Sequence, residues 1–195
     1  MPVGIYHERQ SRQLCALHAL NNLFQDPRAF TKNDLDLICK ALSPRSRILN
    51  PHRSVLGLGC YDVNVIISAL AKKSYEVIWF DKRKDPSCLR LDNIFGFILN
   101  VPNPLNGNVF TLPLSYFPIP DNIWSSRKHW IAVRKIGTNY FDLDSKLVEP
   151  AFIGDGQSLV QYLRTKNLSD QVEILIIVDK PTADAHAWEN IDSPS

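Results

Sequence analysis

The chain has 195 residues, with 22 Lys and Arg against 20 Asp and Glu, and its formal net charge is +2. This near balance argues against a nucleic-acid-binding protein, which normally concentrates basic residues on one surface. A content of 45% hydrophobic and 22% charged residues is typical of a globular domain with a sizeable core. No apolar run reaches 18 residues, so we expect no transmembrane helix.

The cysteines do not form a disulfide or metal pattern. All four are widely spaced, and they are Cys15, Cys39, Cys60 and Cys88. The first ten residues lack the apolar core of a secretory signal, so we expect reduced thiols and a cytoplasmic location. Cys15 and His18 have the spacing of metal ligands, but a single C-x-x-H without a second pair is a weak zinc signal. We therefore predict neither a metal nor a cofactor.

The first part of the chain predicts helices. Residues 15–24 are apolar on nearly every side of a helix, which indicates a buried one. A second helix is predicted over 33–42, because Thr31 and Asp34 at its start resemble a capping box. A third is predicted over 61–73, where apolar residues recur at helical spacing.

The rest of the chain predicts a sheet. Five segments rich in β-branched and aromatic residues are 75–80, 94–101, 129–135, 139–144 and 173–179. Gly137 and Thr138 suggest a hairpin between the third and fourth. Residues 155–167 predict a helix capped by Asp155. Helices followed by a mostly antiparallel sheet indicate the α+β class.

Two further segments lack a regular pattern. The proline-rich connection from Val101 to His129 is long for a compact domain, and such loops are usually functional or disordered. Residues 180–195 are polar apart from Trp188, so we expect a loosely ordered tail after a domain that spans 1–179.

Cys15 is the first candidate for chemistry. If a helix begins near Leu14, the free N–H groups of its first turn and the helix dipole stabilise a thiolate at Cys15. A buried structural thiol is the alternative, and position alone leaves both readings open. Cys60, at the start of a predicted helix, is a competing nucleophile. Cys39 is expected in the core. The sequence around Cys88 favours neither a catalytic nor a core role.

A cysteine nucleophile needs a histidine base. His18 lies on the same rigid helix as Cys15, which leaves little room for a substrate between them, so we expect a core or supporting role. His7, His52 and His186 fall in predicted loops or in the tail, where we expect them at the surface.

His129 is the remaining histidine, and it opens a strand directly after the long connection. The predicted hairpin places Asp142 and Asp144 near it, at the end away from the turn. The two carboxylates share a face by strand alternation, so spacing does not choose between them. The resulting order, Cys then His then Asp, is the order of a papain-like thiol hydrolase.

Four blocks now identify a known family by resemblance. The chain resembles the Josephin family of ubiquitin-specific cysteine proteases in YHERQSRQLCALHALNNLFQ, YDVNVIISAL, RKHWIAVRK and YFDLDSKL. The resemblance runs from about Ile5 to Asp179 and is greatest to the short, single-domain josephins. It implies a papain-like Josephin fold, in which N-terminal helices and a helical arm between Thr31 and Tyr61 pack on a mainly antiparallel sheet.

The resemblance also implies an activity, hydrolysis of isopeptide bonds at the C-terminal glycine of ubiquitin through a thioester. Carried over, Cys15 is the nucleophile and His129 the general base and then acid. Asp144 orients His129, at a position where relatives of the ataxin-3 type carry asparagine. Gln10 matches the glutamine that helps form the oxyanion hole. The implied partners are ubiquitin and its conjugates, bound by a monomer.

Two other functions remain open. One is a ubiquitin-binding module that keeps the fold without catalysis, although the presence of every candidate catalytic residue argues against it. The other is a thiol hydrolase for a different ubiquitin-like modifier.

Overall fold

A six-stranded sheet organises the chain in the computed structural model, which describes residues 4–10, 14–44, 61–102 and 128–190. Its strand order is β1-β6-β2-β3-β4-β5, and every neighbouring pair is antiparallel. The strands are β1 (Tyr75–Trp79), β2 (Gly96–Pro102), β3 (Lys128–Ile136), β4 (Asn139–Asp142), β5 (Ala151–Gly154) and β6 (Glu173–Asp179).

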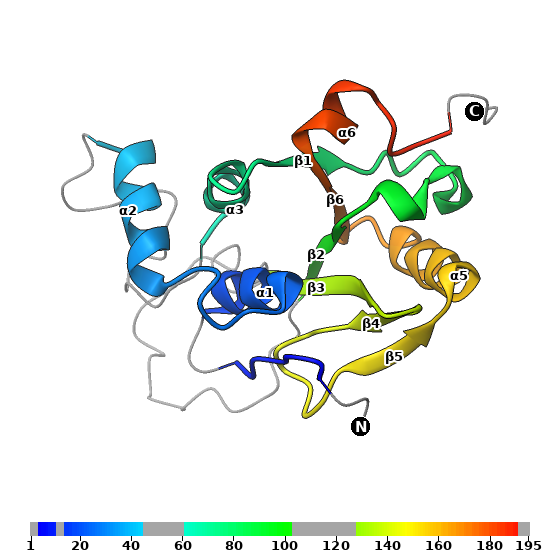
Figure 1. Cartoon of the computed structure of the whole chain (residues 1–195), viewed down its shortest axis with the longest axis horizontal. Coiled ribbons are helices and arrows are strands. Elements are labelled where there is room, and N and C mark those ends of the chain that lie inside the picture. Colours follow the sequence, from blue (N-terminus) through cyan, green and yellow to red (C-terminus); the bar gives the residue numbers. More distant parts are fainter. Residues whose placement is uncertain (1–3, 11–13, 45–60, 103–127, 191–195) are drawn as a thin grey trace, which may run out of the picture.

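Helices lie on both faces of this sheet (Figure 1). They are α1 (Cys15–Phe24), α2 (Lys32–Leu42), α3 (Val63–Ala71), α5 (Gly156–Asn167) and α6 (Lys180–Asp184), with short 3-10 turns η1 (Pro86–Cys88) and η2 (Leu91–Asn93). Helices α1 and α3 cover one face and α2 packs outside α3, whereas α5 covers the other face. The predicted α+β class is confirmed.

The central strands are buried on both faces. On β2, Ile98 faces the cluster on the α1 side, and its neighbours Phe97 and Leu99 face the cluster on the α5 side. Strand β6 alternates in the same way, with Leu175 and Ile176 on opposite sides. Because both faces need apolar side chains, these strands are nearly continuous apolar runs in the sequence.

Side-chain caps set where the helices begin. Thr31 and Asp34 form the predicted capping box: the Thr31 N–H donates to Asp34 over 2.8 Å, and the Asp34 N–H donates to Thr31 Oγ1 over 3.2 Å. Asp62 accepts from the Val65 N–H, so α3 begins two residues later than predicted. Asp155 caps α5 as expected.

The predicted hairpin is confirmed. Strands β3 and β4 pair Ile136 with Asn139, which leaves a two-residue turn at Gly137 and Thr138. Gly137 has φ +64°, a backbone conformation that glycine adopts without strain.

The sequence patterns do not predict two ordered segments, strand β5 and the tail. Strand β5 has only four residues and forms the sheet edge beside β4.

The tail, which we expected to be loosely ordered, packs on the domain through Asn190. Trp188 is buried on the α5 side, its carbonyl accepts from the Arg90 N–H, and the Asn190 N–H donates to Cys88. Glu189 also forms an ion pair with Lys84, and the Ala187 carbonyl accepts from the side chain of Asn93. These contacts hold the polar stretch on the domain, and the domain boundary at 179 stays a prediction.

Several predictions fall on residues that the structure does not describe. Cys60, most of the proline-rich connection and the second half of the helical arm lie outside the described residues. In the part of the chain that is described, no helix combines the length and the apolar character that crossing a membrane requires.

Gly96 allows α1 to approach β2, and its replacement tests this packing. A Cβ atom at Gly96 would lie 2.6 Å from Leu23 Cδ1 and 3.0 Å from the carbonyl oxygen of Val133. We predict that Gly96→Ala lowers the free energy of unfolding by about 1–3 kcal/mol, measured by urea denaturation. Gly137→Asn, at a position with no atom near its Cβ and a tolerated left-handed backbone, should cost only ~0.5 kcal/mol. Equal stability of Gly96→Ala and the wild type would contradict the close approach.

Candidate functional site

Cys15 is the first residue of α1, and it is 7% exposed. Leu14 is the N-cap residue, and its side chain makes no capping hydrogen bond. The first turn of a helix is the position at which the helix dipole favours a thiolate. Cys15 lies in the same buried cluster as Trp130, the residue after His129. Helix α1, which begins at Cys15, packs against β3, the strand that carries the histidine.

His129 and Asp144 form a direct pair. His129 is the second residue of β3 and is only 2% exposed, and its Nε2 lies 2.6 Å from Oδ1 of Asp144. A carboxylate only accepts, so Nε2 carries the hydrogen and Nδ1 is left with a lone pair. The imidazole is thus held in the tautomer that can take a proton at Nδ1.

Asp144 lies in a tight turn after β4, which we call the Asp144 turn (Asp144–Leu147). The Leu147 N–H donates to the Asp144 carbonyl over 2.9 Å, and the Lys146 N–H donates to Oδ1 of the same residue over 2.9 Å. Nε2 of His7 lies 2.9 Å from that carbonyl as well. The backbone and the carboxylate of Asp144 are therefore both anchored.

The charge state of Asp144 follows from these contacts. Burial by itself raises the pKa of the carboxyl group, but the hydrogen bonds from His129 and from the Lys146 N–H outweigh it and hold the pKa below its usual value. Asp144 is therefore ionised at neutral pH, as the orientation of an imidazole requires.

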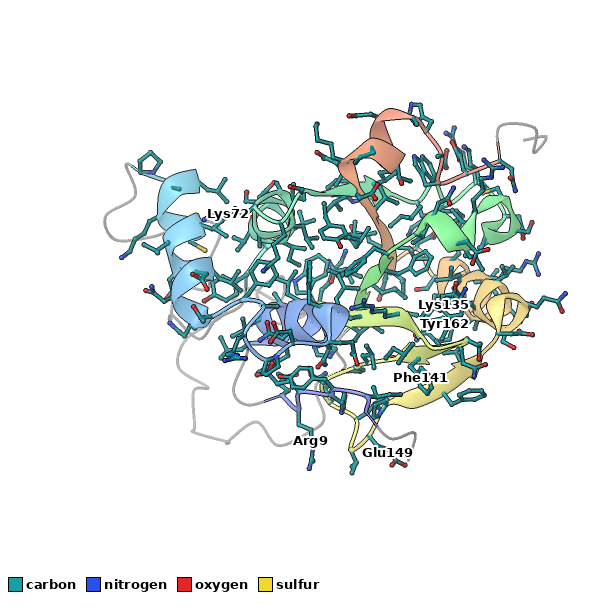
Figure 2. All side chains as sticks on the ribbon, in the orientation of Figure 1. Arg9, Lys72, Lys135, Phe141, Glu149 and Tyr162 are labelled. Atoms are coloured by element: carbon teal, nitrogen blue, oxygen red, sulfur yellow. The ribbon has the colours of Figure 1, made fainter. Side chains whose placement is uncertain are left out.

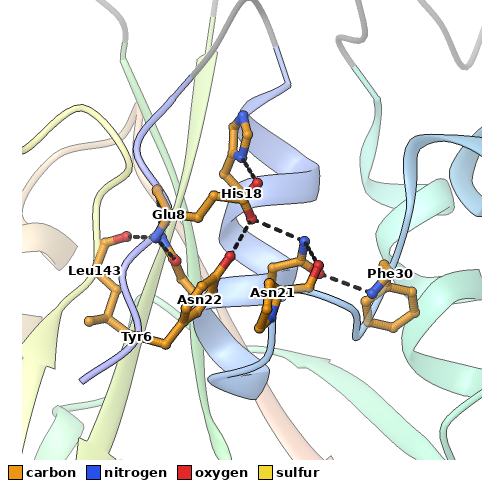
Figure 3. A network of polar contacts seen from close by, with 8 residues as sticks. Tyr6, Glu8, His18, Asn21, Asn22, Phe30 and Leu143 are labelled. Carbon is orange, nitrogen blue, oxygen red and sulfur yellow. Dashed lines mark hydrogen bonds and ion pairs between the residues drawn. The ribbon is translucent and has the colours of Figure 1, made fainter. Parts of the chain in front are cut away.

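The polar face of α1 binds the N-terminal arm, which we define as residues 5–10. The side chain of Asn22 accepts from the Glu8 N–H over 2.6 Å and donates to the Glu8 carbonyl over 3.3 Å. It also donates to the carbonyl of Leu143 over 2.9 Å (Figure 3). One fully buried amide thus joins the arm, α1 and the segment that leads into Asp144.

The Glu8 carboxylate collects a second set of contacts on α1. Nδ1 of His18 lies 3.0 Å from Oε1 of Glu8, and the Asn21 amide and the Tyr6 hydroxyl donate to Oε2 (Figure 3). Arg9, the next residue, points away from the molecule (Figure 2). His18 therefore supports the arm through Nδ1, as expected.

Gln10 is the last described residue of the arm, five positions before Cys15. Its N–H donates to the carbonyl of Ser145 over 2.6 Å, which fixes the backbone of Gln10 beside the Asp144 turn. The arm thus connects the residue expected in an oxyanion hole with the residue that orients His129.

Asp142, the alternative to Asp144 in the sequence, points elsewhere. It is the last residue of β4, and its Oδ2 accepts from the hydroxyl of Tyr162 on α5 over 2.8 Å. Burial raises the pKa of Asp142, whereas hydrogen bonds from Tyr162 and from the Asp144 N–H oppose that rise. Geometry therefore selects Asp144 as the partner of His129.

The structure corrects the expectation for one histidine. His7 is partly buried and contacts Asp144, although we expected it at the surface. No local pattern marks it, because its partner lies 137 residues away. Within residues 4–10, 14–44, 61–102 and 128–190, no three His, Cys, Asp or Glu side chains gather as metal ligands.

Comparison with known proteins gives one family. The sequence model of the Josephin family matches residues 10–178. A Josephin-like protein of Drosophila melanogaster is 48% identical over 93% of this chain and 77% of its own length. Josephin-2 of Mus musculus is 41% identical over 97% of this chain and 94% of its own length. Ataxin-3 of Gallus gallus is 29% identical over 78% of this chain but only 39% of its own length.

Loss of the Asn22 amide should release the N-terminal arm. Asn22→Ala leaves the Glu8 backbone and the Leu143 carbonyl without a buried partner, so we predict a loss of about 3 kcal/mol in the free energy of unfolding. Denaturation with urea measures this loss. The matched control is Asn64→Ala, because Asn64 is exposed and donates only to Asp62; it should change stability by less than about 0.5 kcal/mol. Equal losses in the two variants would refute the role of the Asn22 amide.

The lowered pKa of Asp144 predicts a pH dependence of stability. A carboxyl group whose pKa is lower in the folded state stabilises the fold above its unfolded pKa of about 3.9, and loses that contribution as pH falls through the folded pKa. Asp144→Asn should therefore lower the free energy of unfolding by about 1–2 kcal/mol at pH 7, and by progressively less below pH ~4. Chemical denaturation at a series of pH values measures the difference. A difference that stays constant down to the lowest pH would count against the ionised pair.

Proposed function

The chain belongs to the Josephin family, and on that premise we propose that it is a deubiquitinase, a cysteine-type hydrolase that cleaves peptide and isopeptide bonds at the C-terminal glycine of ubiquitin. Its helices and six-stranded antiparallel sheet are the papain-like Josephin fold that the sequence predicts. The observation that carries the proposal is the 2.6 Å contact between His129 and Asp144, because His129 is on β3, the strand against which α1 packs.

The first half of the reaction forms a thioester. His129 takes the thiol proton of Cys15 at Nδ1, and the thiolate attacks the glycine carbonyl. When the tetrahedral intermediate collapses, the imidazolium returns the proton to the leaving lysine amine. The Asp144 carboxylate holds the ring in orientation and stabilises its positive charge.

The tetrahedral intermediate carries an oxyanion, for which we propose two donors. These are the side-chain amide of Gln10 and the backbone N–H of Cys15 in the first turn of α1. The hydrogen bond from Gln10 to Ser145 supports this role, because it holds the arm beside the Asp144 turn before any substrate binds. Preorganised donors of this kind stabilise the transition state without reorganising during the reaction.

The second half of the reaction releases ubiquitin. His129, neutral again, removes a proton from water, which attacks the thioester carbonyl. Collapse of this second intermediate expels the Cys15 thiolate, and the free carboxylate of ubiquitin leaves. The proposed reaction therefore needs no metal or cofactor.

The partners proposed are ubiquitin and ubiquitin conjugates, bound by a monomer in the cytoplasm. Family membership supports the ubiquitin partner. The monomeric state and the location stay predictions from the sequence. Sedimentation of the purified protein tests the first, and cell fractionation tests the second.

Labelling with a ubiquitin probe that carries a C-terminal electrophile tests the proposal. We predict that the wild type forms a covalent adduct of one ubiquitin, that Cys15→Ala forms none, and that His129→Ala reacts at least about 100-fold more slowly because the thiol lacks its base. Intact-mass spectrometry and gel shift measure the adduct.

Two controls make the result specific. Cys39→Ala removes another buried thiol, which lies on α2, and should label at the wild-type rate. Probes built on other ubiquitin-like modifiers should react poorly. Adduct formation that persists in Cys15→Ala would move the nucleophile to another cysteine such as Cys60. Ubiquitin binding without any adduct or turnover would identify a non-catalytic ubiquitin-binding module.

A further inference from the structure

We propose that Asp142 and Tyr162 are positioning residues, which hold Asp144 in place for His129 through a chain of hydrogen bonds that starts on α5. The inference rests on the proposed function for its catalytic consequence. It concerns the carboxylate that the sequence offered as an alternative to Asp144 and that the proposed mechanism leaves unused.

The chain of contacts is continuous. The Tyr162 hydroxyl donates to Oδ2 of Asp142 over 2.8 Å, and Oδ1 of Asp142 accepts from the Asp144 N–H over 3.0 Å. Asp144 in turn accepts from His129 over 2.6 Å. Both oxygens of Asp142 are therefore engaged, one by a helix and one by the turn that carries Asp144. Figure 2 shows Tyr162 where α5 meets the sheet.

The position of Asp142 at the end of its strand explains why Asp144 needs an additional hydrogen bond. Strand β4 ends at Asp142, so the ladder of backbone hydrogen bonds does not extend to Asp144. The Asp142 side chain takes over by accepting the Asp144 N–H, which fixes the first peptide group of the Asp144 turn. A carboxylate bonded on one side only would rotate about its side-chain torsions, and the Tyr162 hydroxyl prevents this rotation.

The surroundings of Asp142 are consistent with a positioning role. The carboxyl group is largely removed from water, and burial is the main reason why its pKa is raised. No cation forms an ion pair with Asp142 in the described part of the chain, so its two donors are what compensate its burial. Nζ of Lys166, one turn further along α5, lies 5.1 Å from the ring centre of Tyr162 and makes a cation–π contact with it.

Three substitutions separate hydrogen bonding from charge. Tyr162→Phe keeps the ring and removes the donor. Asp142→Ala removes both hydrogen bonds. Asp142→Asn removes the charge but still offers an oxygen to the Asp144 N–H and an amide to the Tyr162 oxygen. Tyr140→Phe is the matched control for Tyr162→Phe. Tyr140 is on β4, the strand that carries Asp142, and its hydroxyl has no hydrogen bond within the described residues.

Steady-state cleavage of a ubiquitin substrate is the first readout. We expect kcat to fall about fivefold in Tyr162→Phe and about tenfold or more in Asp142→Ala, with KM unchanged because neither residue contacts ubiquitin in the proposed mechanism. Asp142→Asn should recover most of the turnover that Asp142→Ala loses, and Tyr140→Phe should match the wild type. A kcat of Tyr162→Phe equal to that of Tyr140→Phe, or an equal loss in Asp142→Asn and Asp142→Ala, would overturn the inference.

A double-mutant cycle distinguishes positioning from general destabilisation. If Tyr162 acts through Asp144, then Tyr162→Phe should lower kcat less than about twofold when Asp144 is already alanine. The same factor with and without Asp144 would mean that the hydroxyl acts on the fold as a whole, which contradicts the inference.

A second readout does not depend on activity. Exchange of the Asp144 amide hydrogen with solvent, followed by NMR, should be about fivefold faster in Tyr162→Phe and unchanged in Tyr140→Phe. If the wild type neither labels nor cleaves ubiquitin, the proposed function fails, yet this exchange rate still decides whether Tyr162 and Asp142 hold the Asp144 turn. Unchanged exchange in Tyr162→Phe would refute the positioning chain.

Discussion

Helix α1 is buried on every side, and the rest of the candidate site depends on this constraint. From Cys15 to Leu23 all nine residues are buried, including the polar side chains of His18, Asn21 and Asn22. Polar groups without water need partners, since an unpaired buried amide costs more free energy than its hydrogen bond contributes. The N-terminal arm supplies partners to all three side chains through Glu8. Burying the helix that carries the thiol therefore fixes the segment that ends at Gln10.

Hydrogen bonds of the same kind also hold the Asp144 turn on the other side of the site. Asn22 reaches the carbonyl of Leu143, His7 contacts the carbonyl of Asp144, and Gln10 donates to Ser145. The arm thus lies between α1 and the Asp144 turn and binds both. Residues far apart in the chain are brought together by neutral hydrogen bonds to backbone groups, whose directions are more restrictive than those of surface ion pairs.

Much of the fold follows from local patterns. The boundaries of α1, α2 and α5 match the predicted ones within a residue, because apolar spacing and caps such as Thr31 and Asp155 act within one turn of helix. Strand β5 escapes prediction, since its four residues form a sheet edge with Phe152 exposed and carry no buried alternation. The order of the tail is not predicted either, because Trp188 and Glu189 contact residues that lie far away in the sequence.

The sequence by itself determined the chemical types and the order of the candidate catalytic residues, together with their family. Helix periodicity placed Cys15 in a first turn, and the hairpin turn at Gly137 brought two aspartates toward His129. Residue spacing did not separate Asp142 from Asp144, because strand alternation puts both on one face. Tertiary structure decided between them: β4 ends at Asp142, α5 offers it the Tyr162 hydroxyl, and the turn that follows directs Asp144 to the imidazole. That choice depends on hydrogen-bond directions between segments distant in sequence, which no local pattern encodes.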